Sequence, residues 1–238
     1  MAFAVVALVR VTEISLQLDT NQSVLGLIFF GTIVGYNFLK YFESFQNGTF
    51  DLNTNHYLVG LTFFSLIATT FYFLQLNNAL QIYFAKVGLL VVTYPFLRKY
   101  GFWKLFLVSF CVTIITVYIP VLQQNMFLKN ERIILMQRFL IVVSLLIPFE
   151  ILDSKTDAVS LKTIPQRFGI FRTILFGISL LFLFMLLEFF KETFQISTVV
   201  IALITGFFIG FTNLKRDKFY TSFWVESVPI IWWGMLSM

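Results

Sequence analysis

Three acidic side chains in the second half of the chain have the spacing of a metal site. Glu150, Asp153 and Asp157 stand at positions i, i+3 and i+7. On an α-helix these positions lie within about 60° of one another, so the carboxylates share one face. A divalent cation between them relieves their repulsion, and oxygen ligands suit Mg²⁺, which also takes phosphate oxygens from a substrate. The spacing therefore predicts a magnesium site, although a solvated helix end with mixed charges has the same pattern.

Basic residues surround this acidic group. Lys155 lies inside it, and Lys162, Arg167 and Arg172 follow it. Carboxylates beside cations are typical of a site where a metal ion bridges the protein to a diphosphate. We therefore expect Lys162 and Arg167 to contact the diphosphate.

The scarcity of other reactive residues narrows the chemistry. The chain has one histidine, His56, and one cysteine, Cys111. One histidine excludes a multi-histidine metal site and makes Ser-His-Asp or Cys-His catalysis a poor interpretation. One cysteine excludes an intramolecular disulfide.

The composition places these residues in a membrane protein. Of the 238 residues, 58% are hydrophobic and 12% are charged, whereas soluble domains have about 45–50% apolar and about 25% charged residues. This number of charged residues is too small to cover the surface of a water-soluble protein. The net charge of +5 is interpreted as loop charge that sets topology, and no nucleic-acid partner is expected.

The apolar residues fall into segments long enough to be membrane helices. A helix that crosses about 30 Å of hydrocarbon needs roughly 20 apolar residues. Polar turns and charged connectors divide the chain into about nine such segments, near residues 2–18, 23–46, 57–76, 79–97, 102–122, 131–152, 169–190, 195–214 and 219–237. We predict an all-α polytopic membrane protein that forms a single transmembrane domain over residues 1–238. The acidic cluster then lies where the sixth segment ends.

The basic residues predict the orientation in the membrane. The connections after the second, fourth, sixth and eighth segments carry eleven Lys and Arg residues, and the other connections carry at most five. Basic loops stay on the cytoplasmic side. We therefore expect an integral protein of a bacterial plasma membrane, with its N-terminus and the acidic cluster in the cytoplasm.

Charges inside the apolar segments are also candidates for function. Lys86 lies midway along the fourth segment, and an ionisable residue at membrane depth is a functional candidate unless its stem carries the ammonium to the membrane surface. Arg10 and Glu13 are three positions apart in the first segment, and we expect them to pair.

The acidic cluster and its surroundings resemble a known family. Glu150, Asp153 and Asp157, followed by Lys162-Thr-Ile-Pro165 and Phe168-Gly169, are similar to the second aspartate-rich motif of UbiA-type intramembrane prenyltransferases. The family also has a Tyr-Pro pair and two basic residues after its fourth helix, where this chain has Tyr94-Pro95 and Arg98-Lys99. The resemblance covers most of the chain in layout and about 30 residues in motif.

The first motif of the family is degenerate in this chain. That motif, N-D-x-x-D-x-x-x-D, belongs at the end of the second helix, where Asn37 matches the leading asparagine. Three aromatic residues stand where its acids belong, and Glu43 is out of register; the aromatic residues are Phe38, Tyr41 and Phe45. This chain therefore keeps one acidic cluster where the family has two.

The resemblance implies a UbiA-like bundle and a function. UbiA-type enzymes hold an isoprenyl diphosphate through Mg²⁺ and transfer its prenyl group to a lipophilic acceptor. In this chain it implies Mg²⁺ as cofactor on the acidic cluster, with diphosphate-binding residues Lys162, Arg167, Arg98, Lys99, Asn37 and Lys40. The tyrosines and phenylalanines near these positions are candidates to line a dry pocket. An alternative is a catalytically degenerate member that binds membrane lipids or a partner protein. A transporter is a weaker third possibility.

Overall fold

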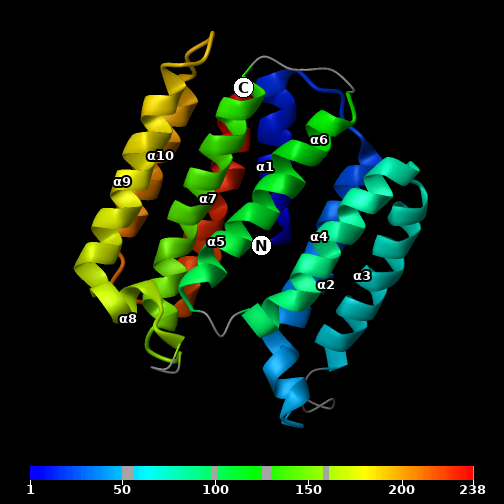
Figure 1. The fold of residues 1–238 in the computed structure, drawn as a ribbon, viewed down its shortest axis with the longest axis horizontal. Helices are drawn as coiled ribbons and strands as arrows, with labels where there is room; N and C mark the ends of the chain where they lie inside the picture. Colours follow the sequence, from blue (N-terminus) through cyan, green and yellow to red (C-terminus); the bar gives the residue numbers. More distant parts are fainter. Residues whose placement is uncertain (50–55, 98–100, 125–129, 158–160, 238) are drawn as a thin grey trace.

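The chain forms helices joined by short connections, as Figure 1 shows for this computed structural model. The structure describes residues 1–49, 56–97, 101–124, 130–157 and 161–237, without the side chains of Glu43 and Phe102. Within these ranges no residue lies in a β-strand. The all-α prediction is therefore confirmed for the described part of the chain.

In its described residues, the first half of the chain contains four helices and a rod made of three consecutive helical segments. These are α1 (Ala2–Leu16), α2 (Gln22–Gln46), α3 (His56–Leu74), α4 (Asn78–Leu97) and then α5 (Phe102–Thr113), which continues through the π-helical segment η2 (Ile114–Tyr118) into α6 (Ile119–Leu122). Pro120 in this rod lacks the N–H that would bond one turn back, which accounts for irregular helix geometry next to it.

The second half contains three long helices, a short one and a final rod. These are α7 (Glu131–Asp153), the single-turn α8 (Ile164–Phe168), α9 (Ile170–Glu188), α10 (Ile196–Gly210) and then the π-helical segment η4 (Tyr220–Val225), which continues into α11 (Glu226–Leu236). Gly169 separates α8 from α9 at φ 79° and ψ 162°, a backbone conformation that is nearly restricted to glycine.

Six of these helices are long and apolar enough to cross a membrane. They cover Gln22–Phe42, His56–Leu74, Asn78–Phe96, Trp103–Leu122, Glu131–Asp153 and Ile170–Glu188. The helices α1 and α10 have 15 residues each, so each rises about 22 Å, less than the 30 Å of a hydrocarbon core. The membrane-embedded character is confirmed, whereas the nine spans and the UbiA-like arrangement are not.

Buried and exposed apolar residues confirm this setting. The largest core cluster joins α1, α7, α9, α10 and α11 through buried residues such as Leu8, Ile141, Phe184, Ile201 and Trp232. On α3, by contrast, Ser65 is the buried residue, and Phe63, Phe64 and Phe71 are 59–64% exposed. Large apolar side chains that face outward over whole helices suit contact with lipid and not with water.

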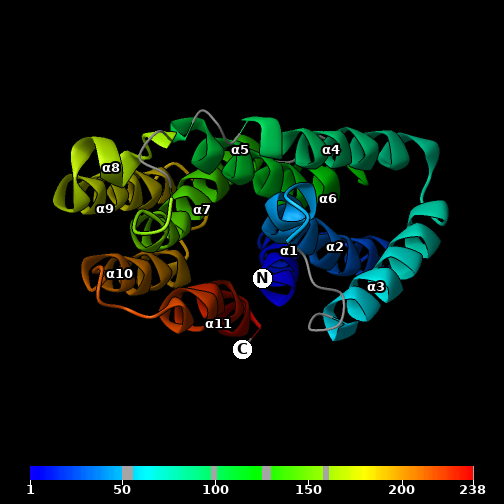
Figure 2. The ribbon, with the colours of Figure 1, turned by 90° about the horizontal axis from the view of Figure 1, so that it is seen from below.

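The helices divide into two groups around α1. Seen from below in Figure 2, α2, α3 and α4 lie to one side of α1, and α7 to α11 lie to the other. Figure 1 places the connections α7–α8 and α10–η4 at the same end of the bundle. The acidic cluster therefore lies at this end, which the basic loops predict to be cytoplasmic.

Candidate functional site

The three acidic residues predicted from the sequence are brought together. Glu150 and Asp153 lie in the last turn of α7, which ends at Asp153. Beyond that end the Asp157 N–H still donates to the Asp153 carbonyl oxygen at 2.8 Å, four residues back. This helix-like hydrogen bond keeps Asp157 near Glu150, as the helical spacing predicts.

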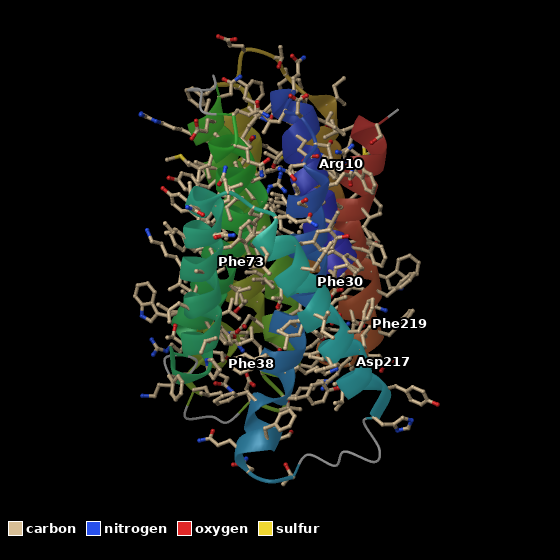
Figure 3. The ribbon with its side chains drawn as sticks, turned by 90° about the vertical axis from the view of Figure 1, so that its right-hand side faces the viewer. Arg10, Phe30, Phe38, Phe73, Asp217 and Phe219 are labelled. Carbon is tan, nitrogen blue, oxygen red and sulfur yellow. The ribbon has the colours of Figure 1, made fainter. Side chains whose placement is uncertain are left out.

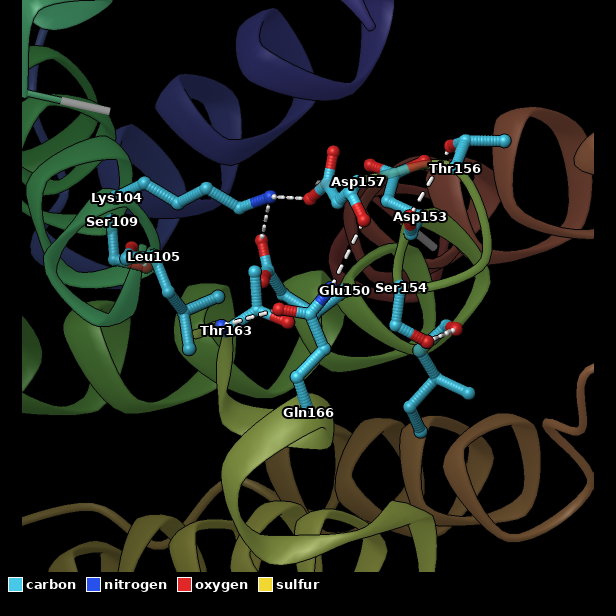
Figure 4. A network of polar contacts seen from close by, with 11 residues as sticks. Lys104, Leu105, Ser109, Glu150, Asp153, Ser154, Thr156, Asp157, Thr163 and Gln166 are labelled. Atoms are coloured by element: carbon cyan, nitrogen blue, oxygen red, sulfur yellow. Dashed lines mark hydrogen bonds and ion pairs between the residues drawn. The ribbon is translucent and has the colours of Figure 1, made fainter. Parts of the chain in front are cut away.

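A lysine that the sequence analysis counted only as a loop charge completes the cluster. The Nζ atom of Lys104, in the first turn of α5, lies 3.0 Å from Glu150 Oε1 and 2.9 Å from Asp157 Oδ2. All three side chains are at most 8% exposed. Figure 4 shows Lys104 between the two carboxylates, with Asp153 beyond Asp157 on the far side.

Lys104 takes the position that was predicted for a metal ion. Among the described residues no group of three or more acidic, histidine or cysteine side chains has the geometry to hold a metal. The oxygen donors are nevertheless of the right chemical type for Mg²⁺. Glu150 Oε2 is buried and has no hydrogen-bond partner, so one acceptor of the cluster is left for a further cation or donor.

The short helix α8 fixes the chain that leads away from the acids. The Gln166 side chain donates from Nε2 to the Asp157 carbonyl oxygen at 3.1 Å and accepts at Oε1 from the Thr163 N–H at 3.0 Å. Thr163 and Gln166 have the spacing of a helix N-terminal capping box. The Thr163–Gln166 spacing is a signal in the sequence from which this short helix could have been predicted.

A glycine fixes the start of α5, and with it Lys104. Gly101 has φ 27°, and a Cβ atom built on it would lie 1.7 Å from the carbonyl oxygen of Leu161. Glycine alone allows the two backbones to approach so closely. The start of α5 therefore packs directly on the chain that follows the acidic cluster.

The predicted diphosphate-binding cations do not all converge on the acids. Lys162 and Arg167 are exposed near Gln166 and belong to the same end of the bundle. Lys40 is exposed, and its Nζ atom lies over the rings of Tyr36 and Tyr41 at 5.8 and 5.2 Å.

Two further candidates in the predicted set, Arg98 and Lys99, lie outside the described residues. Asn37 contacts α3 instead of the acidic cluster, because its Nδ2 atom donates to Thr62 Oγ1 at 2.8 Å.

An apolar cavity lies next to the cluster. It has a volume of about 460 Å³ and is walled by α1, α2, α3, α4 and the α5–η2 rod. Its wall includes Leu107 and Val108, about one turn beyond Lys104 on α5. Tyr36 also lines it, from α2. The cavity therefore begins about one turn of α5 away from Lys104, and none of the four charged residues of the cluster is among the residues that line it.

Aromatic residues named in the sequence analysis form part of this cavity. Phe38, which stands where the resemblance expects the first acid of a motif, lines it together with Tyr36, Tyr94 and Phe73. Figure 3 shows Phe38 near the same end as Asp217, and Phe73 nearer the middle of the bundle. Phe45 is 59% exposed and is not among the lining residues. The aromatic residue at this position therefore forms part of an apolar wall.

Lys86 does not point into the bundle. It is exposed on α4, and its Nζ atom lies 5.3 Å from the centre of the Tyr83 ring, one turn closer to the end away from the acids. The Lys86 side chain therefore extends toward the end of the bundle away from the acids, as a lysine does when its aliphatic stem carries the ammonium to a membrane surface. The expected pair of Arg10 and Glu13 is confirmed at 2.5 Å.

A second polar cluster lies at the opposite end of the bundle, and the sequence analysis missed it. Glu188 is fully buried and accepts hydrogen bonds from Gln137 Nε2, the Gln195 N–H and Lys191 Nζ at 2.8 to 2.9 Å. It thereby ties α7, α9 and the start of α10 together. A glutamate among apolar residues near the end of a span is the signal that would have indicated it.

Next to this second cluster, Arg138 ties α7 to α1. It is 1% exposed and donates to the Leu8 carbonyl oxygen and to Thr12 Oγ1 at 2.7 and 2.9 Å. Its guanidinium carbon also lies 5.3 Å from the centre of the Trp232 ring on α11. These contacts indicate that this end of the bundle is a structural clamp.

Comparison with protein-family models, with curated proteins and with solved structures finds no match for this chain.

Proposed function

We propose that this protein binds an isoprenyl diphosphate at the end of the bundle that holds Lys104, Glu150 and Asp157. The supporting observation is that a buried charged cluster lies about one turn of α5 from Leu107 and Val108, which line an apolar cavity of about 460 Å³. A ligand that fits both parts has a charged head and an apolar tail. Ligand pockets are commonly 300–1,000 Å³ and mostly apolar, with a few polar groups that set orientation.

The head would bind at the charged cluster. Lys104, together with the exposed Lys162 and Arg167, supplies cations for phosphate oxygens, and Arg98 and Lys99 remain candidates from the sequence. Glu150, Asp153 and Asp157 would hold Mg²⁺, which neutralises charge on a diphosphate. The unpartnered Oε2 atom of Glu150 supports this assignment.

The tail would lie along the cavity wall. The aromatic side chains of Tyr36, Phe38 and Tyr94 line the cavity from α2 and α4. The face of an aromatic ring is suited to stabilise positive charge, and an apolar wall keeps water from a reactive cation.

We propose further that the reaction is UbiA-like prenyl transfer to a lipophilic acceptor. The bond between the allylic carbon and the diphosphate oxygen breaks, and the diphosphate leaves with the electron pair. The acceptor forms a new bond to the allylic carbon and releases the proton that it carried at the reacting atom. The cations of the cluster stabilise the charge that develops on the leaving diphosphate.

A second candidate function is lipid binding without chemistry. It is favoured by one observation: Phe38 replaces the first acid of the degenerate motif and faces the apolar cavity, while Asn37 is bonded to Thr62 on α3. A protein with one acidic cluster would keep the apolar pocket and lose the transfer reaction.

Binding measurements on the detergent-solubilised protein separate the two functions. The ligands are geranylgeranyl diphosphate, geranylgeraniol and inorganic diphosphate, each with Mg²⁺ or with a chelator. The proposal predicts that geranylgeranyl diphosphate with Mg²⁺ binds most tightly and that the chelator weakens it. Equal affinity for geranylgeraniol, unchanged by the chelator, would support lipid binding alone and contradict the proposed function.

A further inference from the structure

A groove on the outside of the bundle lies between the α5–η2 rod, α7 and α9, with a volume of about 680 Å³. All three helices contribute to its lining, which includes Phe110, Tyr118, Met136, Phe139, Leu183 and Leu187. Phe110, Met136 and Leu183 are 46–61% exposed, so the groove is open to the surroundings of the bundle. The rod, α7 and α9 are all long and apolar enough to cross a membrane. The groove therefore opens to lipid hydrocarbon.

This groove is separate from the cavity of about 460 Å³ that we assign to the isoprenyl tail. Cys111 and Ile115 of the rod line that cavity, whereas Phe110 and Thr113 line the groove. The Thr113 hydroxyl donates to the Ser109 carbonyl oxygen of its own helix at 2.8 Å, which satisfies it without a ligand. The walls of the groove therefore suit an alkyl chain.

The groove has about the depth of one membrane leaflet. On the rod it extends from Phe110 to Tyr118, a rise of about 12 Å, and half of a hydrocarbon core is about 15 Å. Its residues on α7 belong to the first half of that helix, and those on α9 lie near the end of that helix. Figure 1 shows the rod and α7 diverging toward this end of the bundle. The groove therefore occupies the leaflet opposite the acidic cluster.

A cation lies on the same helix face as the floor of the groove. Arg132 is the second residue of α7 and is exposed. Met136 and Phe139 follow it by four and seven positions, so the three side chains share one face of α7. Side chains on a helix lean toward its N-terminus, which carries the Arg132 guanidinium toward the membrane surface. Among the described residues, no carboxylate forms an ion pair with Arg132.

We propose that this groove binds one acyl chain of a membrane phospholipid whose phosphate is held by Arg132. An apolar groove of leaflet depth with a cation at its membrane-surface end matches an alkyl chain with an anion at its end. The guanidinium presents a planar fork of N–H donors that fits two phosphate oxygens. The lipid site does not depend on the proposed function, because it has no residue in common with the acidic cluster or the cavity.

The test uses a phosphatidylglycerol that carries a photoreactive diazirine in one acyl chain. It is added to the detergent-solubilised protein, and mass spectrometry of the cross-linked peptides shows where the chain lies. Unlabelled phosphatidylglycerol and a diacylglycerol with the same acyl chains serve as competitors. These two competitors differ only in the headgroup, so they separate the phosphate contact from the binding of the chain.

Two kinds of variant have matched controls. Leu183→Trp and Met136→Trp each fill the groove, and Arg132→Gln removes the cation. Leu186→Trp is the control for the groove, because Leu186 is 40% exposed on α9 but is not among the lining residues. Arg172→Gln is the control for the cation, because Arg172 is exposed near the other end of α9. An unchanged circular dichroism spectrum confirms that each variant is folded.

We predict cross-links in the peptides that contain Met136 and Leu183. Phosphatidylglycerol competes about fivefold better than the diacylglycerol, as expected for one basic residue at a membrane surface, and Arg132→Gln removes this difference. The two tryptophan variants that fill the groove lower the cross-linking yield about tenfold, because methylene groups of the chain lose their burial. Leu186→Trp and Arg172→Gln keep the wild-type behaviour.

Equal competition by the two lipids in the wild type would show that Arg132 does not hold the phosphate and would overturn the proposal. An unchanged yield in both Leu183→Trp and Met136→Trp would overturn it as well, because the chain would then lie elsewhere. If a second copy of the protein covers the groove, these peptides are not cross-linked and size-exclusion chromatography shows a dimer, which also rejects the lipid site.

Discussion

The ammonium of Lys104 lies 2.9 Å from the carboxylate of Asp157, although 53 positions of sequence separate the two residues. This contact joins the first turn of α5 to the turn after α7. Because of this contact, acidic residues at and just beyond the end of α7 form a buried cluster that includes a lysine. The positioning of Lys104 therefore decides what the cluster binds.

Gly101 is expected to be essential for that positioning. In Gly101→Ala the new methyl group meets the Leu161 carbonyl oxygen, so the start of α5 must move and Lys104 must move with it. We predict a loss of about 2 kcal/mol or more in the free energy of unfolding and weaker binding of diphosphate. The control is Gly60→Ala on α3, where a Cβ atom meets nothing within 4 Å. Equal effects of the two changes on unfolding and on diphosphate binding would contradict the packing of α5 described above.

Glu188 is expected to hold the opposite end of the bundle together. Glu188→Gln keeps the size of the side chain but leaves the buried Lys191 ammonium without its counter-ion. We predict a loss of about 3 kcal/mol in the free energy of unfolding, since breaking a buried pair leaves an uncompensated charge. Thermal and denaturant unfolding in detergent measure it. The change Glu192→Gln at the exposed neighbouring acid should stay within about 0.5 kcal/mol, and a similar loss there would refute the clamp.

The Lys191 ammonium predicts a pH dependence of stability. Lys191 lies in the connection between α9 and α10, and burial lowers its pKa below the ordinary 10.5 despite the opposing effect of Glu188. At pH values between the lowered pKa of Lys191 in the folded protein and 10.5, this side chain is protonated more often in the unfolded chain than in the folded one. The free energy of unfolding therefore rises with pH over this range. We expect the unfolding temperature to rise less over this range in Lys191→Met than in the wild type. Parallel pH profiles for the two proteins would contradict this assignment.

The basic loops predict that the acidic cluster faces the cytoplasm. In a Cys111→Ser background, Lys215→Cys should resist a membrane-impermeant thiol reagent in intact cells, and Glu192→Cys should react with it. Both positions are exposed and lie at opposite ends of the bundle. Labelling of position 215 from outside would reverse the orientation and place the cluster on the other side of the membrane.

The sequence predicted the helices well because each one depends mainly on local composition. The segment predicted at 131–152 corresponds to α7 at Glu131–Asp153, and the break predicted between the segments 2–18 and 23–46 separates α1 from α2. Spans were harder to predict than helices. The apolar segments 2–18 and 195–214 predict full crossings, but α1 and α10 end after 15 residues each.

The site was predictable only where its residues share one stretch of chain. Glu150, Asp153 and Asp157 share a helix face, and local backbone hydrogen bonds preserve that face past the end of α7. The contact of Lys104 with Asp157 and that of Asn37 with Thr62 depend on how distant helices pack. Nothing in the local pattern around Lys104 distinguishes it from the other loop lysines, so the sequence assigned it only to topology.

The central claim is that the acidic cluster binds a diphosphate together with Mg²⁺. Asp157→Asn keeps the shape of the side chain, removes one charge and leaves Lys104 paired with Glu150. Lys155→Ala is the control, because Lys155 is exposed and close in sequence but has no ion pair with these carboxylates among the described contacts. A folded Asp157→Asn protein is confirmed first by an unchanged helical circular dichroism spectrum.

The deciding measurement is the affinity of each protein for geranylgeranyl diphosphate in Mg²⁺ at matched ionic strength. We predict that Asp157→Asn weakens binding by about tenfold to a hundredfold, as loss of a metal-supporting carboxylate does, and that Lys155→Ala binds as the wild type does. Equal affinity in the wild type, Asp157→Asn and Lys155→Ala would show that the cluster is a buried ion-pair group with a structural role only and would contradict the assignment of this site.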